Sequence, residues 1–128
     1  MADNLTDAAE LLALNFLFNA QTATRPTLPL KLALSTSAGS DTTAGTEVTG
    51  GSYARQTVVF GAASAGAVAT TADVVFTGMP ATTITGIEIY DSAGTPVRLA
   101  YGTLSASKTT NSGDTFTIAT GNLTISLA

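Results

Sequence analysis

The sequence predicts a mainly β fold: a single antiparallel β-sandwich or jelly roll of about seven or eight short strands with an N-terminal α-helix. Threonine, which favours half-exposed strands, accounts for 24 of the 128 residues. Short runs of alternating apolar residues recur along the chain, separated by turn-forming glycine, proline, asparagine and aspartate. One apolar run without this alternation lies near the N-terminus. We therefore expect a helix at 1–20 and one β-sandwich domain at 21–128.

The N-terminal run predicts a helix over residues 4–19. Candidate caps are Asp3, Asn4 and Thr6, and the acidic first turn suits the positive end of the helix dipole. Apolar residues cover more than one face: Leu5, Ala8, Leu12 and Phe16 form one stripe, and Leu11, Leu14, Leu17 and Phe18 occupy the rest. One domain buries one stripe, so the other faces need a further partner. Either the helix is wedged between sheet and loops, or it contacts other subunits.

The strands follow a linker at 20–29, where Pro26 and Pro29 block continuation of the helix. They are expected at 28–34, 53–60, 73–76, 83–90, 97–101, 115–119 and 123–127. The low-complexity stretch 61–72 predicts either a short strand or a loop. The seven runs, with turns about every dozen residues, are typical of a sandwich.

Residues 35–52 predict a long surface loop, rich in serine, threonine and glycine. At its end, Gly50-Gly51 permits a tight turn into the strand that begins at Tyr53. A turn centred there places Glu47 opposite Arg55, so that the two side chains pair across it. Two interpretations of Arg55 stay open: an exposed ion pair, or an arginine that also bonds loop carbonyls and holds the loop in place.

The composition excludes most catalytic chemistry. Histidine and cysteine are absent, which removes Ser-His-Asp and Cys-His catalysis, zinc and iron–sulfur sites, and disulfides. Among the carboxylates, Glu88 is expected on a solvated strand face and Asp91 in a turn, and Asp41, Asp73 and Asp114 lie in loops without a calcium-binding pattern. We expect no enzyme activity, no cofactor and no metal.

The charge balance also limits the partners. Five basic residues against nine acidic ones make no large basic patch, so we expect no nucleic acid. The apolar run is too short to span a membrane. Only 11% of the residues are charged and 45% are hydrophobic, which suits a protein packed among neighbours. The expected partners are further copies of the chain, in a homo-oligomer such as a trimer, and another protein of the same assembly.

One stretch resembles a known family. The run Glu47-Val48-Thr49-Gly50-Gly51-Ser52-Tyr53-Ala54-Arg55-Gln56 is similar to a signature of small tailed-bacteriophage virion proteins, described as tail-fibre or head decoration proteins. The resemblance extends to the helix, to Leu30-Lys31-Leu32-Ala33-Leu34, to Ile87-Glu88-Ile89-Tyr90-Asp91 and to the C-terminal strands. It implies a structural protein located in the virion.

Within that family, our first expectation is a capsid decoration (cement) protein that stabilises the shell by oligomeric contacts with the major capsid protein. The residues expected to make those contacts are Leu11, Leu12, Leu14, Leu17 and Phe18. The alternatives are a neck, tail or head-fibre component, and a carbohydrate- or surface-binding β module. In that last case the 35–52 loop with Tyr53, Tyr90 and Tyr101 would form the site, although tyrosines more often pack within strands.

Overall fold

The computed structural model describes residues 5–19 and 24–127. Its elements are α1 (Asp7–Phe18), β1 (Lys31–Ser35), β2 (Gln56–Thr57), β3 (Ala67–Ala69), β4 (Val74–Met79), β5 (Thr82–Tyr90), β6 (Arg98–Thr110), β7 (Asp114–Ile118) and β8 (Thr124–Ser126). The predicted class, mainly β with one N-terminal helix and eight antiparallel strands, is confirmed. The caps Asp3 and Asn4 and the linker residues 20–23 lie outside the described residues.

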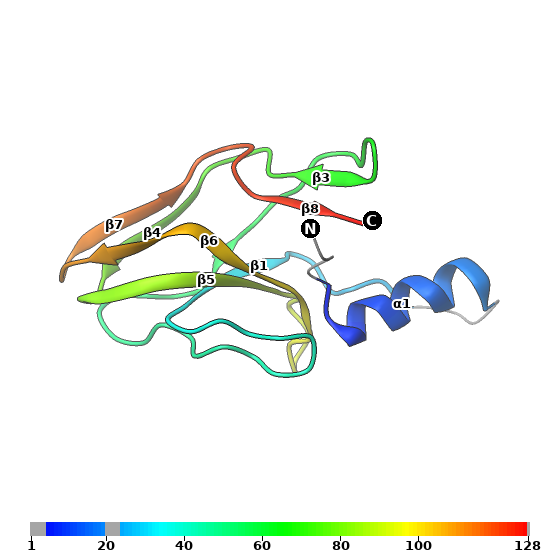
Figure 1. The fold of residues 1–128 in the computed structure, drawn as a ribbon, viewed down its shortest axis with the longest axis horizontal. Helices are drawn as coiled ribbons and strands as arrows, with labels where there is room; N and C mark the ends of the chain where they lie inside the picture. The colour runs from blue at the N-terminus through cyan, green and yellow to red at the C-terminus, as the bar shows by residue number, and fades with distance from the viewer. Residues whose placement is uncertain (1–4, 20–23, 128) are drawn as a thin grey trace.

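The strands form several small sheets rather than one continuous one. A four-stranded sheet has the order β2-β1-β5-β6, and two further pairs are β4-β7 and β3-β8. All pairs are antiparallel, and among the described strands no sheet closes on itself. Figure 1 shows the two pairs along one side of the four-stranded sheet, and the long loop that follows β1 along the other side.

The hydrophobic core fills the space between the four-stranded sheet and the two pairs. Its most buried large side chains come from three strands, β1, β4 and β5: Leu32, Leu34, Phe76, Met79, Ile84 and Ile89. Phe76 of β4 lies at the centre of an aromatic group, stacked on Tyr53 at 5.9 Å and tilted against Phe116 at 6.2 Å between ring centroids. Stacked and tilted rings at such separations add to the stabilisation from burial.

Strand β1 is buried on both faces, and this differs from the predicted half-buried strand. The expected alternation holds for Leu32 and Leu34 on the core face, but Ala33 and Ser35 are buried too, at 1% and 2% exposure. The reason is the loop that covers the opposite face of the sheet. The predicted strand also began three residues too early, since Leu28 is exposed and β1 starts at Lys31.

The other boundaries differ mainly at β2 and β6. The predicted strand 53–60 is reduced to the two paired residues of β2. The stretch 61–72 contains a short strand, β3. Strand β6 continues well beyond its predicted end at residue 101, because residues 108–110 pair with the start of β5 after an irregular stretch. Most of the additional residues are small or polar, with Leu104 as the one large apolar side chain, and they therefore give no alternating apolar pattern.

Candidate interaction site

The base of the helix is tied to the start of β6. Thr6 is the N-cap: its side-chain oxygen accepts a hydrogen bond from the backbone N–H of Ala9 at 3.3 Å and donates one to the carbonyl of Arg98 at 2.6 Å. Its backbone N–H donates to the carbonyl of Leu99 at 3.0 Å, and Leu5 forms a β-bridge with Ala100. The fold therefore fixes the position where α1 begins and the direction in which it leaves the body.

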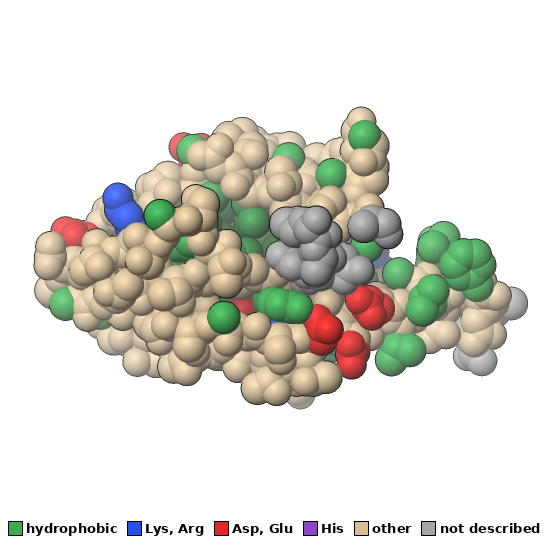
Figure 2. Space-filling view, in the orientation of Figure 1, with side chains coloured by type: hydrophobic (Ala, Val, Ile, Leu, Met, Phe, Trp, Pro, Cys, Tyr) green, Lys and Arg blue, Asp and Glu red, His purple; other side chains and the backbone are tan. Residues whose placement is uncertain are grey.

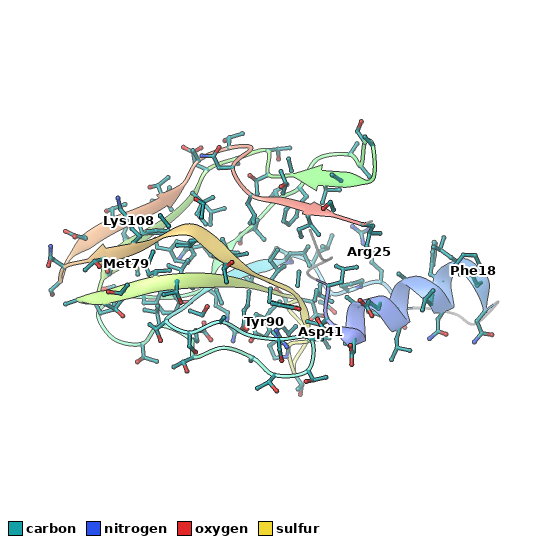
Figure 3. All side chains as sticks on the ribbon, in the orientation of Figure 1. Phe18, Arg25, Asp41, Met79, Tyr90 and Lys108 are labelled. Atoms are coloured by element: carbon teal, nitrogen blue, oxygen red, sulfur yellow. The ribbon has the colours of Figure 1, made fainter. Side chains whose placement is uncertain are left out.

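Beyond this base, α1 projects away from the β-strands, and none of its residues is buried. The exposed fractions of its large apolar side chains are 61% for Leu11, 54% for Leu14, 75% for Phe16, 66% for Leu17 and 79% for Phe18. Figure 2 shows hydrophobic side chains gathered on the projecting helix, and Figure 3 places Phe18 near its distal end. The helix is thus not wedged between sheet and loops within a single chain.

Only one side of the first turns contacts the body. Leu12 is half-buried there together with Leu5 and Ala9. Ala8 and Phe16, predicted on the same stripe, are exposed instead. Phe16 continues the spacing of Leu5 and Leu12 but is 75% exposed, so the described residues cover little of it. Of the five predicted contact residues, four are exposed by more than half, and Leu12 is the exception.

An apolar groove separates the helix base from the body. Its volume is about 350 Å³, and its walls include Leu5, Ala9 and Leu12 on one side and Leu30, Phe60 and Val68 on the other. Its floor is continuous with the core through Ile89 and Ala100. We call this feature the base groove.

On the opposite side of the four-stranded sheet, the structure brings the three predicted loop residues together. Gly50 and Gly51 have positive φ angles of 101° and 57°, and the turn closes with a hydrogen bond from Tyr53 N–H to the Gly50 carbonyl at 3.2 Å. Arg55 donates two parallel hydrogen bonds to the Glu47 carboxylate, at 2.9 and 2.8 Å. The Tyr53 hydroxyl donates a third to the same carboxylate at 2.9 Å.

This cluster has electrostatic and structural consequences. Burial alone would raise the pKa of Glu47, but hydrogen bonds from Arg55 and Tyr53 and the charge of Arg55 lower that pKa below its ordinary value. The hydrogen bonds that Arg55 makes to Glu47, together with the charge of that carboxylate, raise the pKa of Arg55. The Tyr53 hydroxyl also accepts the backbone N–H of Leu34 at 2.9 Å, so the cluster is attached directly to β1.

A second cluster surrounds Glu88, and it corrects the prediction of a solvated side chain. Glu88 is only 2% exposed, because the loop covers it. Its carboxylate accepts hydrogen bonds from the backbone N–H of Gly45 at 2.7 Å, from the Tyr90 hydroxyl at 2.8 Å and from Arg98 at 3.4 Å. Asp91 is a turn-former as predicted, since it accepts the backbone N–H groups of Val97 and Ala93.

Arg98, rather than Arg55, is the arginine that bonds loop carbonyls. Its guanidinium donates to the carbonyls of Ser40 and Asp41, and the Tyr101 hydroxyl donates to the Asp41 carboxylate. The two clusters meet at Tyr90, because the Arg55 guanidinium lies 3.8 Å from the centre of its ring while its hydroxyl bonds Glu88. Burial and the neighbouring Glu88 raise the pKa of Tyr90 to about 12.

We call the two clusters together the loop clamp: Glu47, Tyr53, Arg55, Glu88, Tyr90, Arg98 and Tyr101. It holds residues 36–47 against the sheet through side chains that the sequence places up to 60 residues apart. Sequence reasoning missed Glu88 and Arg98, because neither the register of β5 and β6 nor the path of the loop can be derived from local patterns.

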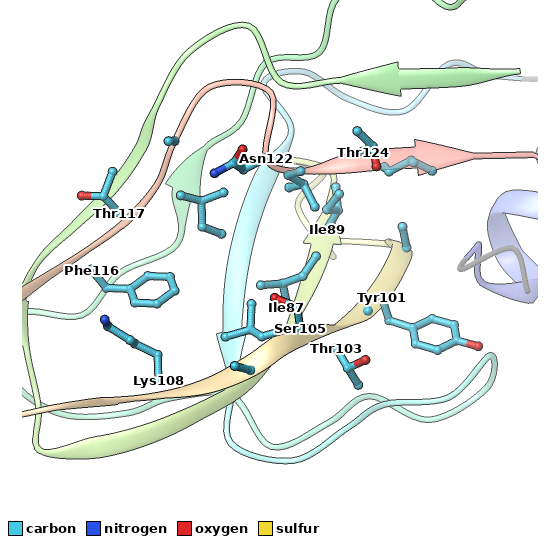
Figure 4. A pocket seen from close by; sticks show the side chains of 18 of the residues that line it. Ile87, Ile89, Tyr101, Thr103, Ser105, Lys108, Phe116, Thr117, Asn122 and Thr124 are labelled. Carbon is cyan, nitrogen blue, oxygen red and sulfur yellow. The ribbon is translucent and has the colours of Figure 1, made fainter. Parts of the chain in front are cut away.

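A cleft of about 700 Å³ lies on the core side, between β6 and the strands β7 and β8. Figure 4 shows its apolar floor, with Ile87, Ile89 and Phe116, and a rim of hydroxyl and amide groups with Lys108. Of the tyrosines, Tyr101 lines this cleft, and its hydroxyl is bound to Asp41. The hydroxyls of Tyr53 and Tyr90 are likewise held by carboxylates within the loop clamp.

The described part of the chain offers no group of acidic side chains that could hold a metal ion. Within the same residues, no helix is long and apolar enough to cross a membrane. The exposed chemistry of this chain is therefore concentrated in the apolar surface of α1, and its buried polar chemistry is concentrated in the loop clamp.

A family model described as Podophage GP4 fiber I protein gp80 matches residues 4–126, a range that contains every helix and strand from α1 to β8. No curated protein matches the chain.

Proposed function

Since the chain belongs to the Podophage GP4 fiber I protein gp80 family, we propose that it is a structural subunit of a virion fibre that joins its neighbours through the apolar surface of α1. Membership makes the chain a component of the phage virion, in agreement with the resemblance identified in its sequence. It also makes it a fibre protein rather than specifically a capsid cement protein, which was our first expectation. The alternative of a fibre component is thus the better supported one.

The observation that carries the proposal is the exposure of the helix. Five large apolar side chains of α1 are more than half exposed, and the helix is only 12 residues long. Isolated helices of this length are marginal in water, and most helices are stabilised by packing of an apolar face. Packing against a neighbouring protein would remove this surface from water and also stabilise the helix.

The energy available from such a contact is adequate for assembly. Complete burial of one leucine or phenylalanine side chain is worth roughly 1.5–3 kcal/mol, so burying a few of them offsets much of the cost of association. Several subunits in one fibre multiply the effect, because each further contact forms at a high effective concentration.

The body suits this role because the carboxylates of its loop clamp are paired within the molecule. The loop clamp holds the 36–47 loop on the sheet with charged hydrogen bonds, so the loop adds a fixed outer layer to the sheet. Rigid bodies joined by short apolar helices make a suitable building unit for an extended particle component.

The test is incorporation into virions. Phage carrying Leu17→Gln with Phe18→Gln should yield purified particles from which this chain is depleted at least tenfold, as measured by quantitative mass spectrometry against the major capsid protein. Leu28→Gln is the matched control, because Leu28 is an exposed leucine outside the helix. Wild-type copy number in the double variant would overturn the role of the helix.

The same measurement on wild-type particles tests the position in the virion. A fibre subunit should be present at a small number of copies relative to the major capsid protein. A copy number near that of the major capsid protein would favour a capsid cement protein and contradict the proposal of a fibre subunit.

A further inference from the structure

The start of strand β6 holds both the base of helix α1 and the 36–47 loop. The loop clamp uses the side chain of Arg98, whereas the helix base uses the backbone carbonyl of the same residue, which accepts a hydrogen bond from the Thr6 hydroxyl at 2.6 Å. The next carbonyl, that of Leu99, accepts the Thr6 backbone N–H at 3.0 Å. Among the strands, β6 is also the one that α1 contacts most. Two features far apart in the sequence therefore meet at one residue.

An irregularity in β6 brings these two carbonyls to the same side. The register with β5 shifts between Ile89 and Tyr90, and Leu99 is the extra residue on the β6 side. A β-bulge of this kind disrupts the ladder locally and re-aims the groups of the bulged strand. Here the carbonyls of Arg98 and Leu99 both reach the N-cap of α1. Because ladder hydrogen bonds are lost at a bulge, other contacts have to hold its shape.

The side chain of Arg98 supplies such contacts. It is 10% exposed, and its guanidinium donates to the Glu88 carboxylate at 3.4 Å and to the carbonyls of Ser40 and Asp41. The guanidinium also lies 5.4 Å from the centre of the Tyr101 ring. A planar guanidinium held by several partners has little freedom to move. The backbone of the bulge is thus restrained through a side chain that the loop holds.

After the helix, the chain returns to the connection between β5 and β6. The backbone N–H of Thr27 donates to the Asp91 carboxylate at 3.2 Å, and the Thr27 carbonyl accepts the Ser92 backbone N–H at 2.9 Å. The Asp91 carboxylate also accepts the backbone N–H of Val97 at 2.8 Å, which closes the connection just before β6 begins. Both of these anchor points of the helical segment therefore lie on residues 91–99.

We propose that Arg98 is a positioning residue for α1: the loop clamp holds its side chain and thereby fixes the bulge whose carbonyls set the direction in which the helix leaves the body. This inference rests on the proposed function, in which α1 joins the chain to its neighbours, and it adds the residue that orients the helix. A helix whose direction is fixed before assembly loses less conformational entropy on binding.

The test measures the direction of the helix by double electron–electron resonance between two spin labels in the full-length chain. The chain has no cysteine, so labels attach only where cysteines are introduced. Asn19→Cys at the end of α1 and Val75→Cys in β4 supply the two sites, and both residues are exposed. Labelled chains are diluted into an excess of the same chain without labels, so that only distances within one molecule contribute.

Two substitutions of Arg98 are compared with a matched control in this labelled chain. Arg98→Met removes the donors and keeps the backbone carbonyl, and Arg98→Lys also keeps a positive charge beside the buried Glu88. The control is Arg55→Met, because Arg55 is the other arginine of the loop clamp and its contacts are with Glu47 and Tyr90. Thermal unfolding selects the variants that retain the wild-type fold.

The wild-type chain and the control should give the same narrow distribution of distances, and each folded Arg98 variant should at least double its width, because local restraints on the bulge are lost. Arg98 variants with the wild-type width would overturn the inference. Equal broadening by Arg55→Met would also overturn it, since the effect would then not depend on Arg98. A wild-type distribution as broad as that of the variants would show that the helix has no fixed direction, and would overturn it as well.

None of these results decides the proposed function. That proposal is tested separately by the copy number in virions of the variant Leu17→Gln with Phe18→Gln, which alters the apolar surface of α1 and leaves Arg98 in place.

Discussion

The 36–47 loop and helix α1 show opposite relations between local structure and tertiary contact. The loop has no regular secondary structure, yet charged side chains hold it on the sheet from several strands. The helix has regular backbone hydrogen bonds and a satisfied N-cap, yet none of its residues is buried. Regular secondary structure therefore does not indicate whether a segment is packed against the rest of its own molecule. The loop is held by contacts within one molecule, whereas the helix presents an apolar surface that the described residues of its own chain leave exposed.

Removal of the carboxylate at the centre of the loop clamp is expected to have the largest effect on stability. Glu88→Ala should lower the free energy of unfolding by about 3–5 kcal/mol, because it leaves a buried arginine without its carboxylate and two further donors unpaired. Urea denaturation of the purified chain measures this change. A loss below about 1 kcal/mol would show that the loop does not depend on the carboxylate.

The Glu47–Arg55 pair should show a smaller coupling. The two side chains are joined by a double hydrogen bond but are each 30% exposed, so solvent screens part of the attraction. A double-mutant cycle with Glu47→Gln and Arg55→Met should give a coupling energy of about 1 kcal/mol in urea denaturation. Additive effects of the two changes would mean that the pair contributes nothing beyond its separate contacts.

The pH dependence of stability should reflect the carboxylates that the fold keeps ionised. A hydrogen bond from the backbone N–H of Val97 lowers the pKa of Asp91 below its ordinary value of 3.8, and the pKa of Glu47 is also lowered, from 4.5. Each therefore contributes stability that is complete above its unfolded-state pKa and is lost as pH falls through its folded-state pKa. Urea denaturation at a series of pH values from about 6 down to about 2 should show this decline in the free energy of unfolding. Asp91→Asn should make the decline shallower. An equal decline in the variant would contradict the role of Asp91.

The smallest effect on stability is expected at Phe18, the last residue of α1. Phe18→Gln should change the free energy of unfolding of the dilute chain by less than about 0.5 kcal/mol, because the side chain is 79% exposed. The measurement is thermal or urea unfolding at a concentration where the chain is monomeric. A loss of 2 kcal/mol or more, of the order of a buried side chain, would mean that Phe18 packs within its own molecule.

Much of the fold follows from sequence patterns that act locally. The period-two alternation located Leu32 and Leu34 on the core face, and the apolar run with its acidic first turn located the helix. The Gly50-Gly51 turn placed Glu47 opposite Arg55, because a tight turn fixes which residues face each other on its two sides. These features depend on neighbours in the chain, so a single sequence is enough to predict them.

The remaining features depend on contacts between distant segments. Glu88 follows the pattern of a solvated strand residue, and only the return of the loop over the sheet buries it. Arg98 reaches loop carbonyls because of the register between β5 and β6, which no local pattern specifies. Phe16 has the helical spacing of Leu5 and Leu12, but whether it packs depends on how far the β-strands extend along the helix, which the local sequence does not specify. The second half of β6 is not predicted from the sequence, because its residues do not alternate between apolar and polar.

The contact between Tyr53 and β1 has a consequence for particles in which many copies of this chain crowd together. An open strand edge is a template on which a strand of another molecule adds by backbone pairing. Beyond the two-residue β2, however, the backbone N–H of Leu34 is held by the Tyr53 hydroxyl and its carbonyl by the backbone N–H of Val48. This stretch of the edge is therefore sealed by the chain itself, and crowding does not favour sheet-to-sheet aggregation there.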